Sequence, residues 1–289
     1  MPSARAILLG LALLLAAIPV QAQRATLPGI VGADDRRVVE PREYPWSAVG
    51  RLNTSVGQRC TGTLVGPRLV ATAAHCLFNR RTRQPLRPEA VHFLAGYGRG
   101  EWAAMSQATA IRRGIDGPPG DPARDWALVT LAEPIGNRVG WIAPGPAPGD
   151  GQAAILRAGY GQDRAHLPMA VLGCRIRAAP ADRPLLVHDC DAVRGDSGSA
   201  ILAVQGGRVS LIGIHAGHGQ QQGQTIGIAV AARAFRDTVA DWPDSRPPTA
   251  GAGLDPVPTD TVRTLARRLG RPAPPASLEA LARLAHTTP

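Results

Sequence analysis

Three short segments of the chain carry side chains that can act together in nucleophilic catalysis. His75 follows a β-branched, alanine-rich stretch, Asp125 opens an apolar run, and Ser197 lies between glycines. A serine hydroxyl is a poor nucleophile at neutral pH unless a neighbouring base takes its proton, and an imidazole can do so. The three residues occur in the order His, Asp, Ser, one of the chain orders in which such triads are found. Each motif alone is common in turns, so the prediction depends on all three together.

These residues need rigid elements to bring them together, and residues 29–241 have the pattern of short β-strands divided by glycine and proline turns. The alternation of strand and helix that builds a parallel sheet is missing from this region. The expected strands are residues 47–52, 61–65, 69–72, 91–95, 126–131, 153–158, 170–177, 200–204, 209–215 and 225–230. Their spacing predicts an all-β antiparallel barrel or sandwich.

The pattern changes towards the C-terminal end of the sequence. Apolar residues at i, i+4 and i+7 predict one helix over residues 230–242, which Pro243 ends. Residues 245–258 are rich in proline and glycine and are expected to be a linker. Residues 259–289 form a tail in which we expect short, leucine-bearing helices. Helices this short do not fold alone, so the tail must dock on the main domain, bind a partner or fray.

The first 22 residues have the pattern of a signal peptide, with Arg5 before an apolar stretch and small residues at its end. We expect an exported protein, secreted or periplasmic, with no membrane-spanning segment after signal removal; a retained N-terminal anchor is the alternative. Residues 23–29 would then be an N-terminal segment or a short propeptide. The net charge of +10 comes from scattered arginines, so no nucleic-acid partner is expected. The hydrophobic content of 44% excludes a fully disordered chain.

The cysteines are Cys60, Cys76, Cys174 and Cys190. An even number in an oxidising compartment predicts two disulfides, with three possible pairings. A zinc site is the alternative, but the sequence has no Cys-x-x-Cys pair. A bridge from Cys60 to Cys76 would clamp the loop that holds His75, and would stabilise the fold by about 3 kcal/mol in the chain-entropy model.

The three motifs together resemble the trypsin/chymotrypsin-like serine proteases, and among these the bacterial branch that includes glutamyl endopeptidases. The matching stretches are Thr72-Ala73-Ala74-His75-Cys76, Asp125-Trp126-Ala127-Leu128 and Gly195-Asp196-Ser197-Gly198-Ser199. The resemblance spans roughly residues 30–242 and implies a protease domain over residues 30–244. The fold that it implies is a double antiparallel β-barrel of two six-stranded halves, with a C-terminal helix and the active site between the halves.

The resemblance also implies a role for each matching residue. Ser197 would be the nucleophile, and His75 would take its proton and later give it to the leaving amine. Asp125 would hold the imidazole in one tautomer, and the N–H groups of Gly195 and Ser197 would form the oxyanion hole. Protein or peptide substrates would be hydrolysed through an acyl-enzyme, and no metal or cofactor is implied.

Two further residues bear on the substrate side chain before the cleaved bond, called P1. Asp191, six residues before Ser197, would attract a basic P1, whereas His215 resembles the histidine with which glutamyl endopeptidases hold an acidic P1. In one pocket the two would oppose each other, so acidic, basic, and small or apolar P1 side chains all stay open, the last being favoured. A second disulfide, between Cys174 and Cys190, would lie near the entrance of this pocket.

Activation is also left open by the sequence. Ile30-Val31-Gly32 resembles the new N-terminus that trypsin-like zymogens insert beside the aspartate before the nucleophile, which is Asp196 here. The residue before Ile30 is Gly29 rather than Arg or Lys, so another protease, or no cleavage, must be invoked. The alternatives to an active enzyme are a catalytically weak protein of this fold that binds at the cell envelope, or envelope binding by the tail helices. The sequence does not indicate an oligomeric state.

Overall fold

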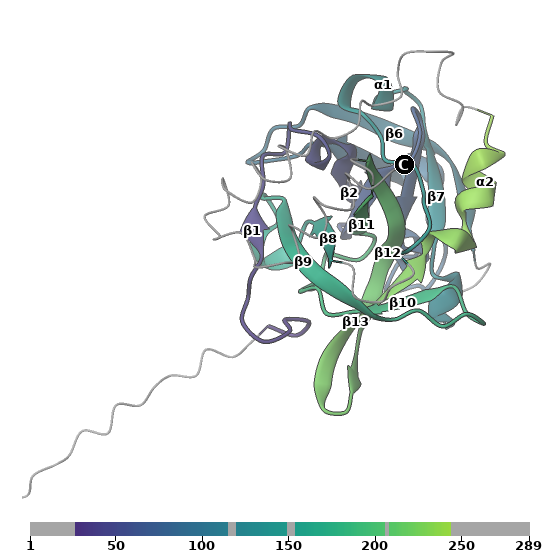
Figure 1. Cartoon of the computed structure of the whole chain (residues 1–289). Helices are drawn as coiled ribbons and strands as arrows, with labels where there is room; N and C mark the ends of the chain where they lie inside the picture. Colours follow the sequence, from purple (N-terminus) through teal and green to yellow (C-terminus); the bar gives the residue numbers. More distant parts are fainter. Residues whose placement is uncertain (1–26, 115–119, 149–153, 206–207, 244–289) are drawn as a thin grey trace, which may run out of the picture.

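Two antiparallel β-barrels form the body of the molecule (Figure 1). The structure is a computed structural model that describes residues 27–114, 120–148, 154–205 and 208–243. The expected signal peptide, the linker and the helical tail lie outside these residues. Within them, no helix combines the length and the apolar character needed to cross a membrane.

The first barrel closes through the strand order β2-β3-β4-β7-β6-β5. Its strands are β2 (Val49–Thr54), β3 (Arg59–Leu64), β4 (Leu69–Thr72), β5 (Val91–Ala95), β6 (Ala104–Arg113) and β7 (Ala127–Leu131). Phe93 fills part of the interior above Gly50 and Gly62, which face each other in register. A Cβ atom at Gly50 would lie 2.4 Å from the phenyl ring, so the glycines make room for this side chain.

The second barrel closes because β8 pairs with both β9 and β11, which gives the ring β8-β9-β10-β13-β12-β11. Its strands are β8 (Ala154–Gly159), β9 (Met169–Ala178), β10 (Leu185–His188), β11 (Ala200–Gln205), β12 (Arg208–Gln221) and β13 (Gln224–Ala231), and β1 (Arg37–Val38) pairs with β9 outside the ring. The strands β12 and β13 continue beyond the barrel as a long hairpin (Figure 1). The chain therefore has the two six-stranded halves that the resemblance implied.

The helical segments in the described residues are short. They are α1 (Gly136–Val139), α2 (Arg236–Ala240), and the 3-10 turns η1 (Trp46–Ala48), η2 (Ala74–Leu77), η3 (Pro88–Ala90), η4 (Pro122–Arg124), η5 (Gln162–Arg164) and η6 (Ala232–Ala234). The helix expected over residues 230–242 therefore differs from the structure in its first part. Val230 lies in β13 and pairs with Leu185 and Ile214, so strand pairing on both sides outweighs the helical periodicity of the sequence.

One buried residue, Thr61 on β3, joins the first barrel to the loop that carries Ser197. The Thr61 N–H donates to the Ser197 carbonyl at 2.9 Å. The Thr61 hydroxyl accepts from the Tyr160 N–H at 2.9 Å and donates to the Gly195 carbonyl at 3.3 Å. Thr61 thus connects the first barrel to the Ser197 loop and to Tyr160 through both its backbone and its side chain.

Candidate active site

His75 and Asp125 are joined by two hydrogen bonds. His75 lies in η2, directly after β4, and its backbone N–H donates to Asp125 Oδ1 at 2.8 Å. The second bond joins His75 Nδ1 to Asp125 Oδ2 at 2.7 Å. An ionised carboxylate only accepts hydrogen bonds, so the proton lies on Nδ1 and Nε2 keeps its lone pair. The pair therefore presents an imidazole nitrogen that can accept a proton.

A disulfide holds the residue after His75 in place. Cys76 is bonded to Cys60 on β3, and Cys174 is bonded to Cys190, which are the pairings named from the sequence. Because the sulfurs of Cys60 and Cys76 are bonded to each other, they are not free thiolates that could ligate a metal beside His75.

Ser197 is half-buried and lies next to the His75 segment. Its carbonyl oxygen is 3.8 Å from Cys76 Sγ. The following residue, Gly198, has φ of +81°, and a Cβ atom there would lie 2.2 Å from the Thr61 carbonyl oxygen. Only glycine fits this close approach, which explains why the nucleophile candidate is followed by glycine.

The backbone on the N-terminal side of Ser197 presents free donors. Gly195 has φ of +100°, a conformation that favours glycine. Among the residues that the structure describes, the N–H groups of Gly195 and Ser197 have no protein acceptor. Two N–H groups next to a candidate nucleophile that no protein acceptor holds are available to an oxygen of a ligand.

In the uncut chain, Asp196 pairs with an arginine side chain; the pair with Ile30 that the resemblance implied belongs to a chain cut before Ile30. Its carboxylate pairs with the guanidinium of Arg157 on β8, with Nη1 and Oδ1 2.6 Å apart, and both side chains are fully buried. The Val193 N–H donates to Asp196 Oδ2 at 2.9 Å. Here the Ile30 N–H belongs to a peptide group and donates to the Leu27 carbonyl at 3.1 Å. In the uncut chain, the cation beside Asp196 therefore comes from the second barrel.

The carboxylate of Asp191, which the resemblance placed in the substrate pocket, is engaged by the N-terminal segment of the domain. Its carboxylate accepts the N–H groups of Val31, at 2.7 Å, and Asp35, at 3.0 Å. Burial raises the pKa of Asp191, and these two hydrogen bonds oppose that rise. Asp191 thus anchors residues 31–35 through both of its carboxylate oxygens.

His215 forms a buried pair with His188. The Nδ1 atom of His215 lies 3.1 Å from Nε2 of His188, and His188 Nδ1 accepts the Cys190 N–H. The backbone of His215 also borders the Ser197 loop, since its carbonyl accepts from Gly198 and its N–H donates to Ser199. Burial lowers the pKa of His188 to about 3 and that of His215 well below its usual value, so both rings are neutral.

Acid should destabilise the protein through this histidine pair. In the unfolded chain both imidazoles take up a proton near pH 6.5, whereas in the folded chain His188 stays neutral down to its pKa of about 3 and burial also lowers the pKa of His215 well below 6.5. The unfolded state binds more protons between these values, so the free energy of unfolding falls as the pH falls. The expected loss is about 1.4 kcal/mol per pH unit for each histidine.

Urea unfolding between pH 6.5 and pH 5 measures this slope. The matched variant is His188→Asn, whose side-chain oxygen can still accept the Cys190 N–H but does not titrate. As the pH falls, the free energy of unfolding of this variant should decrease less steeply than that of the wild type. The two slopes should differ by about 1.4 kcal/mol per pH unit, the contribution of one proton. Equal slopes in the two proteins would show that His188 is not held neutral.

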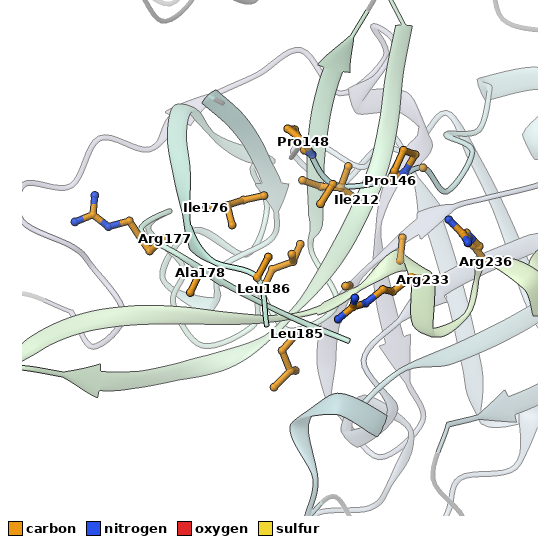
Figure 2. Close-up of a pocket in the computed structure, with 15 residues that line it drawn as sticks. Pro146, Pro148, Ile176, Arg177, Ala178, Leu185, Leu186, Ile212, Arg233 and Arg236 are labelled. Carbon is orange, nitrogen blue, oxygen red and sulfur yellow. The ribbon is translucent and has the colours of Figure 1, made fainter. Parts of the chain in front are cut away.

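Two cavities of the described residues differ in the reactive side chains that line them. One, of about 230 Å³, lies against Asp125 between η4 and β12, with Pro122 and Ile228 in its wall. The other, of about 460 Å³, lies on the second barrel beside α2, and Figure 2 shows it lined by prolines, aliphatic side chains and arginines. The second lining contains neither a nucleophile nor a general base, whereas the first includes Asp125, the hydrogen-bond partner of His75.

Three residues of this region were not predicted from the sequence as parts of a site. They are Arg157, His188 and Arg36. Arg157 did carry a signal, because it stands between Leu156 and Ala158 in an apolar strand, and a charge at a core position requires a buried partner. His188 carries no such mark, since His215 is distant in the sequence, and Arg36 has one partner nearby, Asp34, but its partner in η5, Asp163, is 127 residues away.

Comparisons with known proteins agree with this geometry. The family model described as Trypsin matches residues 34–242. A glutamyl endopeptidase from Bacillus licheniformis is 28% identical over 134 residues, which cover 40% of this chain and 37% of that protein. Serine protease 23 from Homo sapiens is 30% identical over 209 residues, which cover 61% of this chain and 51% of that protein. The chain thus spans only part of the length of these curated relatives, at most 51%.

The fold has a solved counterpart. A structure of a Glu endopeptidase in complex with MPD superposes with a TM-score of 0.61 at 22% sequence identity. The superposition covers 73% of this chain and 97% of that one. At this identity the likeness concerns the double-barrel fold alone.

Proposed function

Because this chain belongs to the trypsin family of serine proteases, we propose that it is an exported endopeptidase that hydrolyses peptide bonds through an acyl-enzyme. The observation that carries the proposal is the hydrogen-bonded pair of His75 and Asp125, together with the unpaired N–H groups at Gly195 and Ser197. A general base and a set of oxyanion donors are the two parts that acyl transfer needs around a serine. The signal-like N-terminus and the two disulfides support export.

In the first half of the reaction, Ser197 Oγ attacks the carbonyl carbon of the substrate while His75 Nε2 takes the hydroxyl proton. The carbonyl oxygen becomes an oxyanion and is bound by the N–H groups of Gly195 and Ser197. The carbon–nitrogen bond then breaks, and the leaving amine receives the proton from Nε2. In the second half, water attacks the acyl-enzyme with Nε2 again as the base, which releases the acid and restores Ser197. Asp125 stabilises the imidazolium formed in both halves.

In this proposal the P1 side chain is acidic. The reason is that a series of hydrogen bonds determines which nitrogen of His188 and of His215 carries the proton. A backbone N–H can only donate, so the Cys190 N–H makes His188 Nδ1 an acceptor. A neutral His188 then carries its proton on Nε2 and donates to His215 Nδ1. His215 is left with its proton on Nε2, and this donor, on a residue whose backbone borders the Ser197 loop, suits a carboxylate. With Asp191 bound to residues 31–35, no support remains for a basic P1.

A peptide series tests both the activity and the preference. One peptide is prepared with Glu, Gln, Arg or Ala at P1, and the cleaved bond is identified by mass spectrometry. Hydrolysis after Glu should exceed hydrolysis after its uncharged isostere Gln by about tenfold in kcat/KM, because the hydrogen bond from the buried donor to a carboxylate is about twice as strong as the one to a neutral amide oxygen.

The variant His215→Val should remove most of this difference and leave the slower cleavage after Ala nearly unchanged. His92→Ala, on β5 of the first barrel, is the control and should keep the wild-type preference. Fastest cleavage after Arg, or a Glu preference that survives in His215→Val, would contradict the assignment of P1.

A further inference from the structure

Arg36 is a fully buried cation held by carboxylates on both sides. Its Nε and Nη2 atoms lie 2.9 and 2.8 Å from the two carboxylate oxygens of Asp34. Its Nη1 and Nη2 atoms lie 3.1 and 2.8 Å from those of Asp163. Two bidentate contacts on one guanidinium fix its position and orientation far more tightly than a single ion pair does. Arg36 therefore ties the segment of residues 29–36 firmly to η5, in which Asp163 lies.

The other side of η5 contacts the candidate oxyanion hole. The N–H of Gln162, the residue before Asp163, donates to the Arg194 carbonyl at 2.7 Å. This carbonyl belongs to the peptide group whose nitrogen is that of Gly195, and the peptide is trans. In a trans peptide the C=O and N–H groups point in opposite directions. Holding the Arg194 oxygen against η5 therefore turns the Gly195 N–H away from η5, as an oxyanion donor requires.

The Arg36 guanidinium, η5 and the turn at Gly195 are closely packed. A Cβ atom on Gly161 would lie 2.6 Å from Asp163 Oδ1 and 3.2 Å from Arg36 Nη1. A Cβ atom on Gly195 would lie 2.8 Å from the Gln162 nitrogen. With glycine at both contact points, the guanidinium, η5 and the Gly195 turn touch one another directly. A displacement of η5 would then be transmitted to the peptide group of Gly195.

The 29–36 segment is also fixed to the other end of the same loop. Asp191 accepts the N–H groups of Val31 and Asp35, and the Ala192 N–H donates to the Gly29 carbonyl at 3.0 Å. The segment thus braces the loop before Ser197 from two directions, through Asp191 and through Arg36.

We propose that Arg36 is a positioning residue for catalysis, which sets the direction of the Gly195 N–H through Asp163 and η5. The inference rests on the proposed function, because it presumes that Gly195 is an oxyanion donor. It gives the uncut 29–36 segment a task in an active enzyme. It also predicts that Arg36 acts on the transition state, where the oxyanion exists, and much less on substrate binding.

Asp34 and Asp163 offer a matched pair of tests. Both hold the same guanidinium with two oxygens, but only Asp163 lies in η5. In Asp163→Asn one carboxylate oxygen is replaced by an NH₂ group that faces the guanidinium, donor against donor, so one of the two hydrogen bonds to η5 is lost together with the ion pair. We expect kcat to fall about tenfold with KM within about twofold, and affinity for a peptide aldehyde, whose serine adduct carries the oxyanion, to fall by the same factor. Asp34→Asn should change kcat by less than about twofold.

The outcomes separate this inference from a purely structural role and from the proposed function. Equal kcat losses in Asp163→Asn and Asp34→Asn, or a loss confined to thermal stability, would overturn the positioning role. Should Asp163→Asn fail to fold, Arg36→Lys is the second variant, because it keeps the positive charge but loses the planar guanidinium that makes bidentate contacts. The positioning role then requires the same fall in kcat with an unchanged KM. A wild-type protein that does not hydrolyse peptides contradicts the proposed function instead, whereas an active wild type with unaffected variants contradicts only the role of Arg36.

Discussion

Arg157→Met is expected to lower the free energy of unfolding by about 3 to 5 kcal/mol at neutral pH, the largest stability loss of any single change considered for this chain. The guanidinium lies 2.6 Å from Asp196 Oδ1, and neither side chain reaches solvent. Methionine fills much of the same space but leaves a buried carboxylate without a cation. Urea unfolding followed by fluorescence measures the loss.

The double variant Arg157→Met/Asp196→Asn serves as the control, because it removes the carboxylate charge together with the cation while an amide oxygen can still accept the Val193 N–H. Its stability should recover at least half of the loss, which a double-mutant cycle reports as a coupling energy. If Arg157→Met loses less than about 1 kcal/mol, Arg157 is not the cation that holds Asp196.

Asp125→Asn is expected to reduce kcat by about 10⁴ with little change in KM, a scale known from equivalent changes in other serine proteases. In the wild type, Asp125 accepts from both the N–H and the Nδ1–H of His75. An asparagine has only one accepting oxygen, and its NH₂ group is a donor. With the oxygen engaged by the backbone N–H, the NH₂ group faces Nδ1, which moves the imidazole proton to Nε2 and removes the base.

Single-turnover kinetics with an ester substrate, alongside circular dichroism to confirm folding, measure this effect on the chemical step. Asp237→Asn, an exposed aspartate in α2, is the matched control and should retain full activity. A kcat for Asp125→Asn within tenfold of the wild type would mean that Asp125 does not set the tautomer of His75.

The strands and the chemistry-bearing residues were largely predictable because their signals are local. Alternating and β-branched runs between turns indicated the barrel strands, and His75, Asp125 and Ser197 each sit in a short motif that needs no distant information. The pair of His75 and Asp125 is present in the structure at 2.7 Å. The helix expected over residues 230–242 failed in its first part for the converse reason, since Val230 takes its conformation from pairing with two other strands.

The sequence could not show which residues would contact Asp196, Asp191 and His188 in the folded chain. Asp196 and Asp191 were both recognised as functionally placed carboxylates, yet the cation of one comes from β8 and the donors of the other from residues 31 and 35. Such choices depend on which strands meet in the closed barrel, and no local pattern records that. The same holds for His188, whose contact with His215 arises from the packing of β10 near β12 around the closed ring.

The most direct test of the central claim is the reaction of the purified protein with a fluorophosphonate, followed by peptide mapping. An activated serine attacks phosphorus and displaces fluoride, whereas an unactivated hydroxyl reacts far more slowly. We predict one adduct, on Ser197, in a chain that has not been cut before Ile30, with labelling abolished in Ser197→Ala and strongly slowed in His75→Ala. No adduct on Ser197, or equal labelling of the wild type and His75→Ala, would contradict the assignment of this site as a serine protease centre.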